Sequence, residues 1–257
     1  MIDLHCHIVP EIDDGSQSIE ESLEMARSAY KMGYREIICT SHYGFGRYEN
    51  ENYKEKFHEL SKALEKEKIP IKIYWGNELY LDLEGLEAAA KGRVNTLGNS
   101  SYMLVEAVYG MTAQSLIGGI EKIIELGYKP VLAHVERYYF LTLKDVRELE
   151  KLGVVFQVNL SSFSNALKKR TRVLLKNNLI HIVASDSHGT KRRTYENASS
   201  GLRELERIVK KEKIELLTRI NPKRILEDCQ IEGGGNEEEQ DINSSFFSSF
   251  FSKFFRR

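Results

Sequence analysis

Residues 1–15, MIDLHCHIVPEIDDG, place two histidines two positions apart within a short apolar run. In a β-strand, residues i and i+2 point to the same face, so the imidazoles of His5 and His7 can reach one ion. Two carboxylates, Asp13 and Asp14, follow directly. We therefore interpret the beginning of this chain as a strand that ends in a metal site.

Short β-rich runs and amphipathic charged segments alternate along the chain. The alternation is typical of βαβ units with a parallel sheet. Seven such strands favour an α/β barrel, and no GxGxxG follows the first strand, as an open dinucleotide-binding sheet would require. The predicted strands are 2–6, 36–40, 71–75, 102–106, 130–134, 154–158 and 180–184. The predicted helices are 18–32, 51–66, 113–126, 143–152, 168–177 and 198–211, with a short one near 214–220.

Several helix boundaries carry a local signal. Ser18 and Glu21 have the spacing of a capping box at the start of the first helix. Gly33, Gly127 and Gly153 each follow a helical run and precede a strand, where a glycine in the left-handed conformation ends many helices.

Potential metal ligands stand at or just beyond the ends of six of the seven predicted strands. The C-terminal ends of barrel strands meet on one face, so these side chains are expected to share a cavity. Any one histidine at such a place is more often structural, but five in this register with carboxylates are specific, and only His58 and His181 fall outside the pattern. The candidates are His5, His7, Asp13, Asp14, His42, Glu78, Glu106, His134, Asp186 and His188.

The ligand types narrow the chemistry. Imidazoles and carboxylates without a thiolate cluster suit Mn, Fe or Zn. So many ligands exceed the needs of one ion and suit two or three ions with bridging carboxylates, an arrangement used to hydrolyse phosphate esters. Arg137 follows His134 closely, and Arg192 and Arg193 follow His188. Their guanidinium groups are candidates for phosphate binding, with solvated surface arginines as the alternative.

Other functional classes are disfavoured. Cys6, Cys39 and Cys229 form no CxxC and no Cys-x5-Arg loop, and the chain has no GxSxG elbow or P-loop. Three scattered cysteines also indicate a reducing, cytoplasmic setting rather than a disulfide framework. With 37 basic and 38 acidic residues, the net charge of −1 argues against general nucleic-acid binding. The sequence shows neither a signal peptide at its beginning nor an apolar run of membrane-spanning length.

Composition changes after residue 232. Residues 1–232 are predicted to form the barrel, and residues 233–257 a glycine-rich and acidic linker followed by the tail SSFFSSFFSKFFRR. As a helix this tail would be amphipathic, which suggests peripheral contact with the inner face of the membrane. A non-native or disordered extension is the alternative.

Eight segments between residues 1 and 226 together resemble the PHP (polymerase and histidinol phosphatase) superfamily. They are most similar to its manganese-dependent tyrosine-protein phosphatases of the CpsB/YwqE type, from capsule and exopolysaccharide operons. The segments are MIDLHCHIVPEIDDG, TSHYG, GNELY, MLVEA, LAHVERY, FQVNLSS, VASDSHG and NPKRIL.

The resemblance implies a distorted seven-stranded (β/α) TIM-like barrel, the PHP fold, with a trinuclear site. It implies phosphate contacts from Arg137 and Arg193, and we assign His42 a catalytic role besides its ligand role. The implied substrate is phosphotyrosine on the Tyr-rich C-terminal tail of a partner bacterial tyrosine kinase that controls capsule or exopolysaccharide synthesis. The implied manganese ligands are His5, His7, Asp14, His42, Glu78, Glu106, His134, Asp186 and His188.

Two alternatives stay open at this point. The same scaffold serves small-molecule phosphoesterases of the histidinol phosphatase kind. A non-catalytic module that binds the kinase tail is the second, although a complete ligand set weighs against it. Fold alone does not decide between these functions.

Overall fold

The computed structural model describes residues 1–44, 46–49 and 51–232. The predicted linker and tail, residues 233–257, lie outside the described residues. Within those residues, no helix combines the length and apolar character that crossing a bilayer requires.

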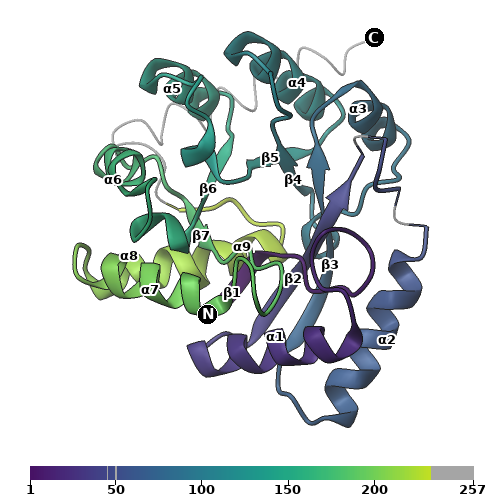
Figure 1. Ribbon diagram of the computed structural model, residues 1–257. Coiled ribbons are helices and arrows are strands. Elements are labelled where there is room, and N and C mark those ends of the chain that lie inside the picture. The colour runs from purple at the N-terminus through teal and green to yellow at the C-terminus, as the bar shows by residue number, and fades with distance from the viewer. Residues whose placement is uncertain (45, 50, 233–257) are drawn as a thin grey trace.

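Seven parallel strands form one sheet in the order in which they occur in the sequence, and the sheet curls into a nearly closed barrel (Figure 1). The predicted barrel is therefore confirmed. The strands are β1 (Ile2–Cys6), β2 (Glu36–Tyr43), β3 (Lys72–Tyr80), β4 (Tyr102–Glu106), β5 (Lys129–Leu132), β6 (Val155–Asn159) and β7 (Ile182–Ala184).

Helices connect the strands and cover the outside of the barrel (Figure 1). They are α1 (Ile19–Met32), α2 (Tyr53–Lys66), α3 (Leu83–Ala90), α4 (Ala113–Glu125), α5 (Leu143–Lys151), α6 (Lys168–Lys176), α7 (Tyr195–Glu206), α8 (Lys211–Glu215) and α9 (Asn221–Leu226). Short helical turns are η1 (Leu97–Asn99), η2 (Val135–Arg137), η3 (Leu160–Phe163) and the π-helical η4 (Leu216–Ile220).

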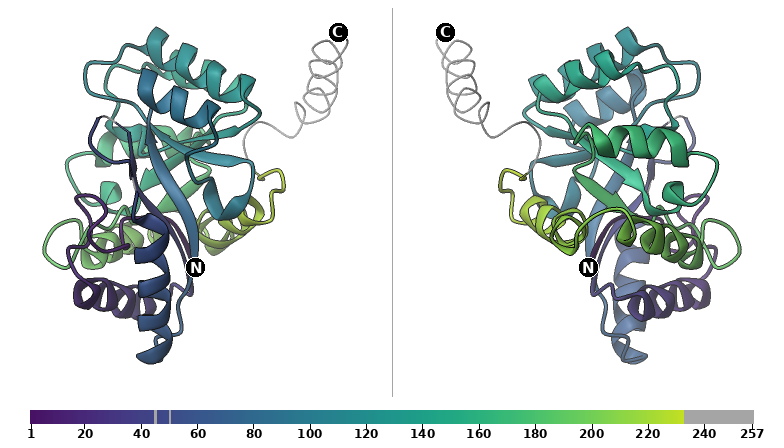
Figure 2. Two further views of the ribbon diagram at one scale, coloured as in Figure 1. Left: turned by 90° about the vertical axis from the view of Figure 1, so that its right-hand side faces the viewer. Right: turned by 90° about the vertical axis from the view of Figure 1, so that its left-hand side faces the viewer.

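The inward face of the barrel changes from apolar to polar along each strand. In β2 the sequence runs from Ile38, in the inner core, to His42 on the same face. In β4 it runs from Leu104 to Glu106. Ile225 of α9 packs into the inner core and closes the N-terminal end, and both views of Figure 2 place the yellow-green α9 beside the N-terminus. The polar residues are left at the opposite, C-terminal end.

A β-bulge modifies the first strand. The register of β1 against β2 shifts between Asp3 and Cys6. Leu4 therefore joins the inner core, whereas Cys6 belongs to the core between the barrel and its helices. This irregularity lets one strand supply both an inner-core residue and the two histidines of the site.

Strands β2 and β3 extend further than predicted. The predicted third strand stops before Gly76, a residue that usually weakens strands. Here a Cβ at residue 76 would lie 2.8 Å from Cγ2 of Ile38, so this position inside the barrel needs a glycine. The extension to Tyr80 places Glu78 within β3 rather than in the loop beyond it.

The helix prediction was incomplete. Helix α3 was not predicted because Gly85 lies in its first turn, where a Cβ would meet the Tyr80 carbonyl oxygen at 2.0 Å. The predicted helix 198–211 is wrong in its bounds. A capping box between Thr194 and Asn197 starts α7 earlier, and the helix ends at Glu206. The predictions also missed α9, which begins at Asn221 and has a proline in its first turn.

Helix ends match the glycine signals. The backbone φ angles at Gly33, Gly127 and Gly153 are 103°, 89° and 84°, all left-handed. At the other end of α1, only half of the predicted capping box forms. The Ser18 side chain accepts a hydrogen bond from the amide of Glu21, but the Glu21 carboxylate turns away to other partners.

Candidate metal centre

The nine residues predicted as ligands lie in one cluster at the C-terminal end of the barrel. Each has an imidazole nitrogen or carboxylate oxygen within 3.5 Å of another member. Pairs that include all nine residues are His5–Glu78 at 3.1 Å, His7–Glu78 at 3.2 Å, His134–Glu78 at 3.0 Å, His134–Glu106 at 3.3 Å, His42–Asp14 at 3.4 Å, His5–Asp186 at 3.4 Å and His188–Asp14 at 3.5 Å.

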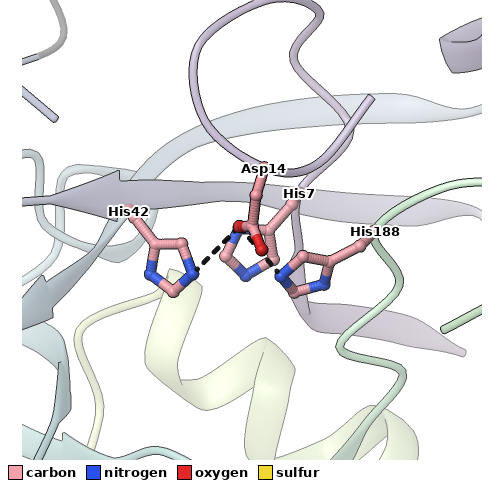
Figure 3. A group of neighbouring side chains, drawn as sticks. All are labelled: His7, Asp14, His42 and His188. Carbon is pink, nitrogen blue, oxygen red and sulfur yellow. Dashed lines mark ion pairs between the residues drawn. The ribbon is translucent and has the colours of Figure 1, made fainter. Parts of the chain in front are cut away.

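Eight of the nine residues form three overlapping groups of ligand atoms, each compact enough to hold an ion, and His134 lies outside these groups. Figure 3 shows one of them, in which Asp14 points between His42 and His188 in front of His7. His7 and His42 each belong to two groups, so each lies between two neighbouring candidate ion sites. The groups are His5, His7 and Asp186; His42, Glu78 and Glu106; and His7, Asp14, His42 and His188.

The hydrogen bonds around His5 fix its tautomer. The amide of His134 donates to Oε1 of Gln157 at 2.8 Å, so this atom is an acceptor. The same oxygen lies 3.2 Å from Nδ1 of His5, which must therefore donate. In the neutral ring, Nε2 of His5 then carries the lone pair that a metal needs.

His7 is fixed in the same way. Its Nδ1 lies 2.7 Å from the Asp13 carboxylate, so it donates there and leaves the lone pair on Nε2. The two Nε2 atoms of His5 and His7 are only 3.1 Å apart. Two lone pairs directed at one another are repulsive unless a cation or a proton lies between them.

Asp13 is therefore an orienting residue rather than a member of the three ligand groups. Besides His7, it accepts hydrogen bonds from the amide of His42 at 2.7 Å and from that of Gly15 at 2.9 Å. One carboxylate thus holds the ends of β1 and β2 in register with each other.

A second chain of hydrogen bonds orients Asp186. Gln157 donates to Asn159 at 2.9 Å, and Asn159 donates to Oδ2 of Asp186 at 2.6 Å. The buried Glu136 carboxylate accepts from the amide of Asn159 at 3.0 Å and from Ser162 at 2.7 Å. Oδ1 of Asp186 has no hydrogen-bond partner among the described residues and faces the histidines.

Two of these residues have an unusual backbone. The φ angles of His134 and Asp186 are 30° and 51°, in the left-handed region that side chains other than glycine rarely adopt. Such conformations cost about 1–3 kcal/mol each and persist where the surroundings fix them. At His134 the strand has already ended at Leu132, so the predicted strand 130–134 is too long at its C-terminal end.

The crowding of carboxylates is visible in their pKa values. Burial, together with the nearby Glu78 and Asp186, raises the pKa of Glu106 to about 9. Burial would also raise the pKa of Glu78, but His5 and His42 hold it well below its ordinary value. Burial and Arg137 lower the pKa of His134 to about 4, so this imidazole is neutral near pH 7. Imidazoles beside crowded carboxylates are a donor set that binds divalent cations.

The arginines differ in their access to the cluster. The guanidinium of Arg137 is 2.5 Å from Oδ2 of Asp186, and that of Arg193 is 2.9 Å from Nε2 of His188. Nδ1 of His188 faces the Asp186 carbonyl oxygen at 3.0 Å, so Nε2 accepts from Arg193. Arg192 is mostly exposed, and its guanidinium lies 3.8 Å from the Asp14 carboxylate.

Glu21, at the start of α1, holds the loop that carries Arg193. One carboxylate oxygen accepts from the amide and the hydroxyl of Thr190, at 3.0 and 3.1 Å. The other accepts from the amide of Gln17 at 3.0 Å. The loops after β1 and β7 are thereby tied together beside the cluster.

Two tyrosines stack against His42. The Tyr80 ring lies 4.7 Å from the His42 ring with an interplanar angle of 14°, and Tyr48 stacks at 5.7 Å. These rings form an aromatic wall next to the second and third groups of ligands.

Sequence reasoning missed the orienting residues Gln157, Asn159 and Glu136. A signal for the first two was present, since they alternate at the end of the sixth strand within the quoted segment FQVNLSS. They were not selected because amides are weaker metal ligands than imidazoles and carboxylates.

The chain is similar to several known proteins. Residues 1–227 match the family model described as capsular polysaccharide synthesis, CpsB/CapC. The chain is 36% identical over 201 residues to the tyrosine-protein phosphatase CpsB of Streptococcus pneumoniae. This match covers 73% of this chain and 83% of the CpsB protein. It is 36% identical over 211 residues to the tyrosine-protein phosphatase YwqE of Bacillus subtilis, with coverage of 76% and 80%.

A solved structure is similar as well. It comes from a study of YwqE from Bacillus subtilis and CpsB from Streptococcus pneumoniae, described as unique metal-dependent tyrosine phosphatases. The TM-score is 0.82 at 32% sequence identity, and the match covers 91% of this chain and 97% of the other.

Proposed function

The chain belongs to the CpsB/CapC family of capsular polysaccharide synthesis, and from this premise we propose that its histidine and carboxylate cluster hydrolyses phosphotyrosine on the C-terminal tail of a bacterial tyrosine kinase. The chain is a metal-dependent tyrosine-protein phosphatase. The nine ligands, the manganese and the kinase tail are the parts that we propose.

One observation carries the metal assignment. The Nε2 atoms of His5 and His7 face each other at 3.1 Å, while acceptors hold both outer nitrogens as donors. Oδ1 of Asp186 faces the same space, at 3.4 Å from His5 and 3.7 Å from His7. These three residues would hold one ion, and the other two groups would hold the neighbouring ions.

Manganese suits this donor set, and iron and zinc share the preference for imidazole and carboxylate. Bound divalent ions supply Lewis-acid activation of the phosphate and of a water. Within the chain, Glu78 has a central place, because its two oxygens contact four of the histidines: His5, His7, His42 and His134.

The arginines act on the phosphate. The Arg137 guanidinium projects toward the cluster with its side chain 29% exposed, so it has an open side for a ligand. A planar guanidinium binds two phosphate oxygens and disperses the charge that builds up in the transition state. Arg193 offers a second cation on the opposite loop, beside His188.

His42 is better suited to holding metal than to donating a proton. Its Nδ1 lies 3.2 Å from Glu78, and its Nε2 lies 3.4 Å from Asp14. Because both ring nitrogens face carboxylates of the cluster, we place His42 in the ligand set. The separate catalytic role expected for His42 receives no support from this geometry.

The decisive experiment combines elemental analysis with kinetics. Purified protein should contain two or three ions per chain and should hydrolyse a phosphotyrosine peptide much faster than histidinol phosphate. Preferential hydrolysis of histidinol phosphate would contradict the tyrosine phosphatase function. Tight binding of the phosphopeptide without turnover, in metal-loaded protein, would identify a binding module instead.

A further inference from the structure

A cavity of about 270 Å³ lies between the loop that follows Arg137 and the first turns of α6. Figure 1 shows α5 and α6 as neighbours around the barrel. The lining combines an aromatic ring, aliphatic side chains and two cations: Tyr139, Leu143, Lys169, Arg170, Val173 and Leu174.

The apolar lining is unusually exposed. Tyr139 is 69% exposed, Leu143 43% and Val173 42%. Large apolar side chains that gather around a depression are typical of surfaces that bind another molecule. The depression is too small for a folded domain but matches one or two side chains of an extended peptide.

The cavity lies beside the loop that carries Arg137. Tyr139 is two residues from Arg137, so their Cα atoms are at most about 7 Å apart. Its amide donates to the Arg137 carbonyl oxygen at 3.1 Å. Arg170, from the cavity wall, donates to the carbonyl oxygens of Tyr138 and Leu141 at 2.7 and 2.9 Å. The arginine that lines the cavity therefore also holds the loop that carries Arg137.

Charge indicates the chemistry of the occupant. Helix α6, KKRTRVLLK, has five basic residues and no acidic one. Lys169 and Arg170 bring two of these charges to the cavity, and the Arg170 guanidinium lies 5.5 Å from the centre of the Tyr139 ring. An apolar depression with a cationic edge is complementary to a segment that carries both apolar and acidic side chains.

We propose that this cavity binds the residues next to the phosphotyrosine of the protein substrate, and that it prefers an acidic flank with one large apolar side chain. This inference rests on the proposed function. An extended peptide advances about 3.3 Å per residue, so the cavity lies within reach of the first few positions beside the phosphotyrosine.

The test compares two phosphotyrosine peptides, one with acidic and aromatic flanking residues and one with serine and glycine flanks. For the wild-type, metal-loaded protein, we expect kcat/KM to be about tenfold higher for the acidic peptide, mainly through KM. Tyr139→Ala and Lys169→Glu should each reduce this preference to about twofold or less.

Matched controls separate the cavity from general effects. Tyr109→Ala removes an exposed tyrosine outside the cavity, from the loop after β4, and Lys176→Glu reverses a charge at the far end of α6. Both control variants should keep the wild-type preference. Melting temperatures of all four variants should stay close to that of the wild type, because the altered side chains are exposed.

The outcomes are distinct. Equal kcat/KM for the two peptides in the wild type, or equal losses in the control variants, would overturn the docking inference while leaving the phosphatase function intact. A change of sedimentation mass in Tyr139→Ala, without a change of peptide preference, would assign the cavity to a second copy of the chain and also overturn it. Failure to hydrolyse either peptide would instead refute the proposed function.

Discussion

The Arg137 guanidinium and the Asn159 side-chain amide both donate to the same atom, Oδ2 of Asp186, at 2.5 and 2.6 Å. The other oxygen of Asp186 faces the histidines. Asp186 therefore keeps one orienting hydrogen bond when Arg137 is replaced, and the effect of Arg137 on catalysis can be measured without dismantling the site.

We predict that Arg137→Ala lowers the turnover of a phosphotyrosine peptide by about 10²–10³, the size of effect seen when one charged contact to a transition state is lost. Arg137→Lys should restore little, because an ammonium group does not make the planar two-point contact. Metal content, measured by elemental analysis, should stay near the wild-type value. Loss of metal in parallel with activity would show that Arg137 acts by holding Asp186.

Replacing Gln157 tests the proposed ligands through metal affinity. Gln157→Leu removes the acceptor that holds Nδ1 of His5 and the amide of His134, so metal affinity should fall about 10–100-fold, as for other orienting residues. Titration against a chelating metal indicator measures this directly. Gln157→Glu keeps the acceptor and is the matched control, with a smaller loss. An unchanged affinity in Gln157→Leu would remove His5 from the ligand set.

The contact between Glu21 and Thr190 gives a third prediction. Glu21→Ala should lower kcat for a phosphotyrosine peptide by about tenfold, because it releases the loop that positions Arg193. Glu20→Ala, one position earlier in the same first turn of α1 and exposed, is the matched control. If the Glu21 contact only stabilises the fold, both the melting temperature and the fraction of folded protein will fall while kcat per folded molecule stays constant.

His181 makes stability depend on pH, away from the metal site. Its Nδ1 accepts a hydrogen bond from the amide of Phe156 at 2.9 Å, and burial, with Lys213 nearby, lowers its pKa to about 4. In the unfolded chain the pKa of His181 has its ordinary value of about 6.5. Between pH 6.5 and pH 4 the unfolded chain therefore binds a proton at His181, whereas the folded chain does not. Stability is then lost as the pH falls from about 6.5 to 4.

The variant His181→Asn keeps an acceptor for Phe156 but does not titrate. The wild type should lose about 2 kcal/mol more of its free energy of unfolding between pH 7 and pH 5 than the variant does. Urea denaturation at both pH values measures this difference. A difference between His181→Asn and the wild type that stays constant between the two pH values would contradict the assignment.

A chain that ends at Glu232 should keep kcat/KM for the phosphotyrosine peptide within about twofold. The cluster and its arginines lie before residue 194, and Glu232 itself is held by Asn221, whose side chain bonds both its amide and its carbonyl oxygen at 2.9 Å. A chain that ends at Ile220 is the contrasting variant. It should be strongly destabilised, because Ile225 no longer fills the inner core. Loss of activity in the chain that ends at Glu232 would assign a catalytic role to residues 233–257.

The sequence predicted the barrel because its strands are short apolar runs between amphipathic helices, and periodicity reports burial directly. Ile38 and His42 illustrate the limit. The pattern indicates that both face inward, but it does not reveal that one fills the core and the other enters the site. That distinction depends on the height of each residue along the barrel axis, which is set by the register between strands.

Ligand types and strand ends selected ten candidates, of which Asp13 proves to orient His7, and the resemblance implied the other nine. Contacts that join distant segments were not predictable. Glu21 has the spacing of a helix cap, and nothing local indicates that it turns to Thr190 instead. Gln157 is one polar residue in an apolar strand, and its role depends on His5 and His134. Such roles arise only when the barrel has closed.

The closure of the barrel also sets the order in which the site can come into existence. The first strand meets the segment after the last one through backbone hydrogen bonds from Asp186 to His5 and from His7 to Ser187, both at 2.9 Å. A ribosome that adds about 5–20 residues per second needs roughly 10–40 s to pass from the first pair of histidines to the last ligand. During that time the cluster is incomplete, because Asp186 and His188 have not yet been added to the chain. The full set of candidate ligands comes together only when the seam between the first and last strands closes.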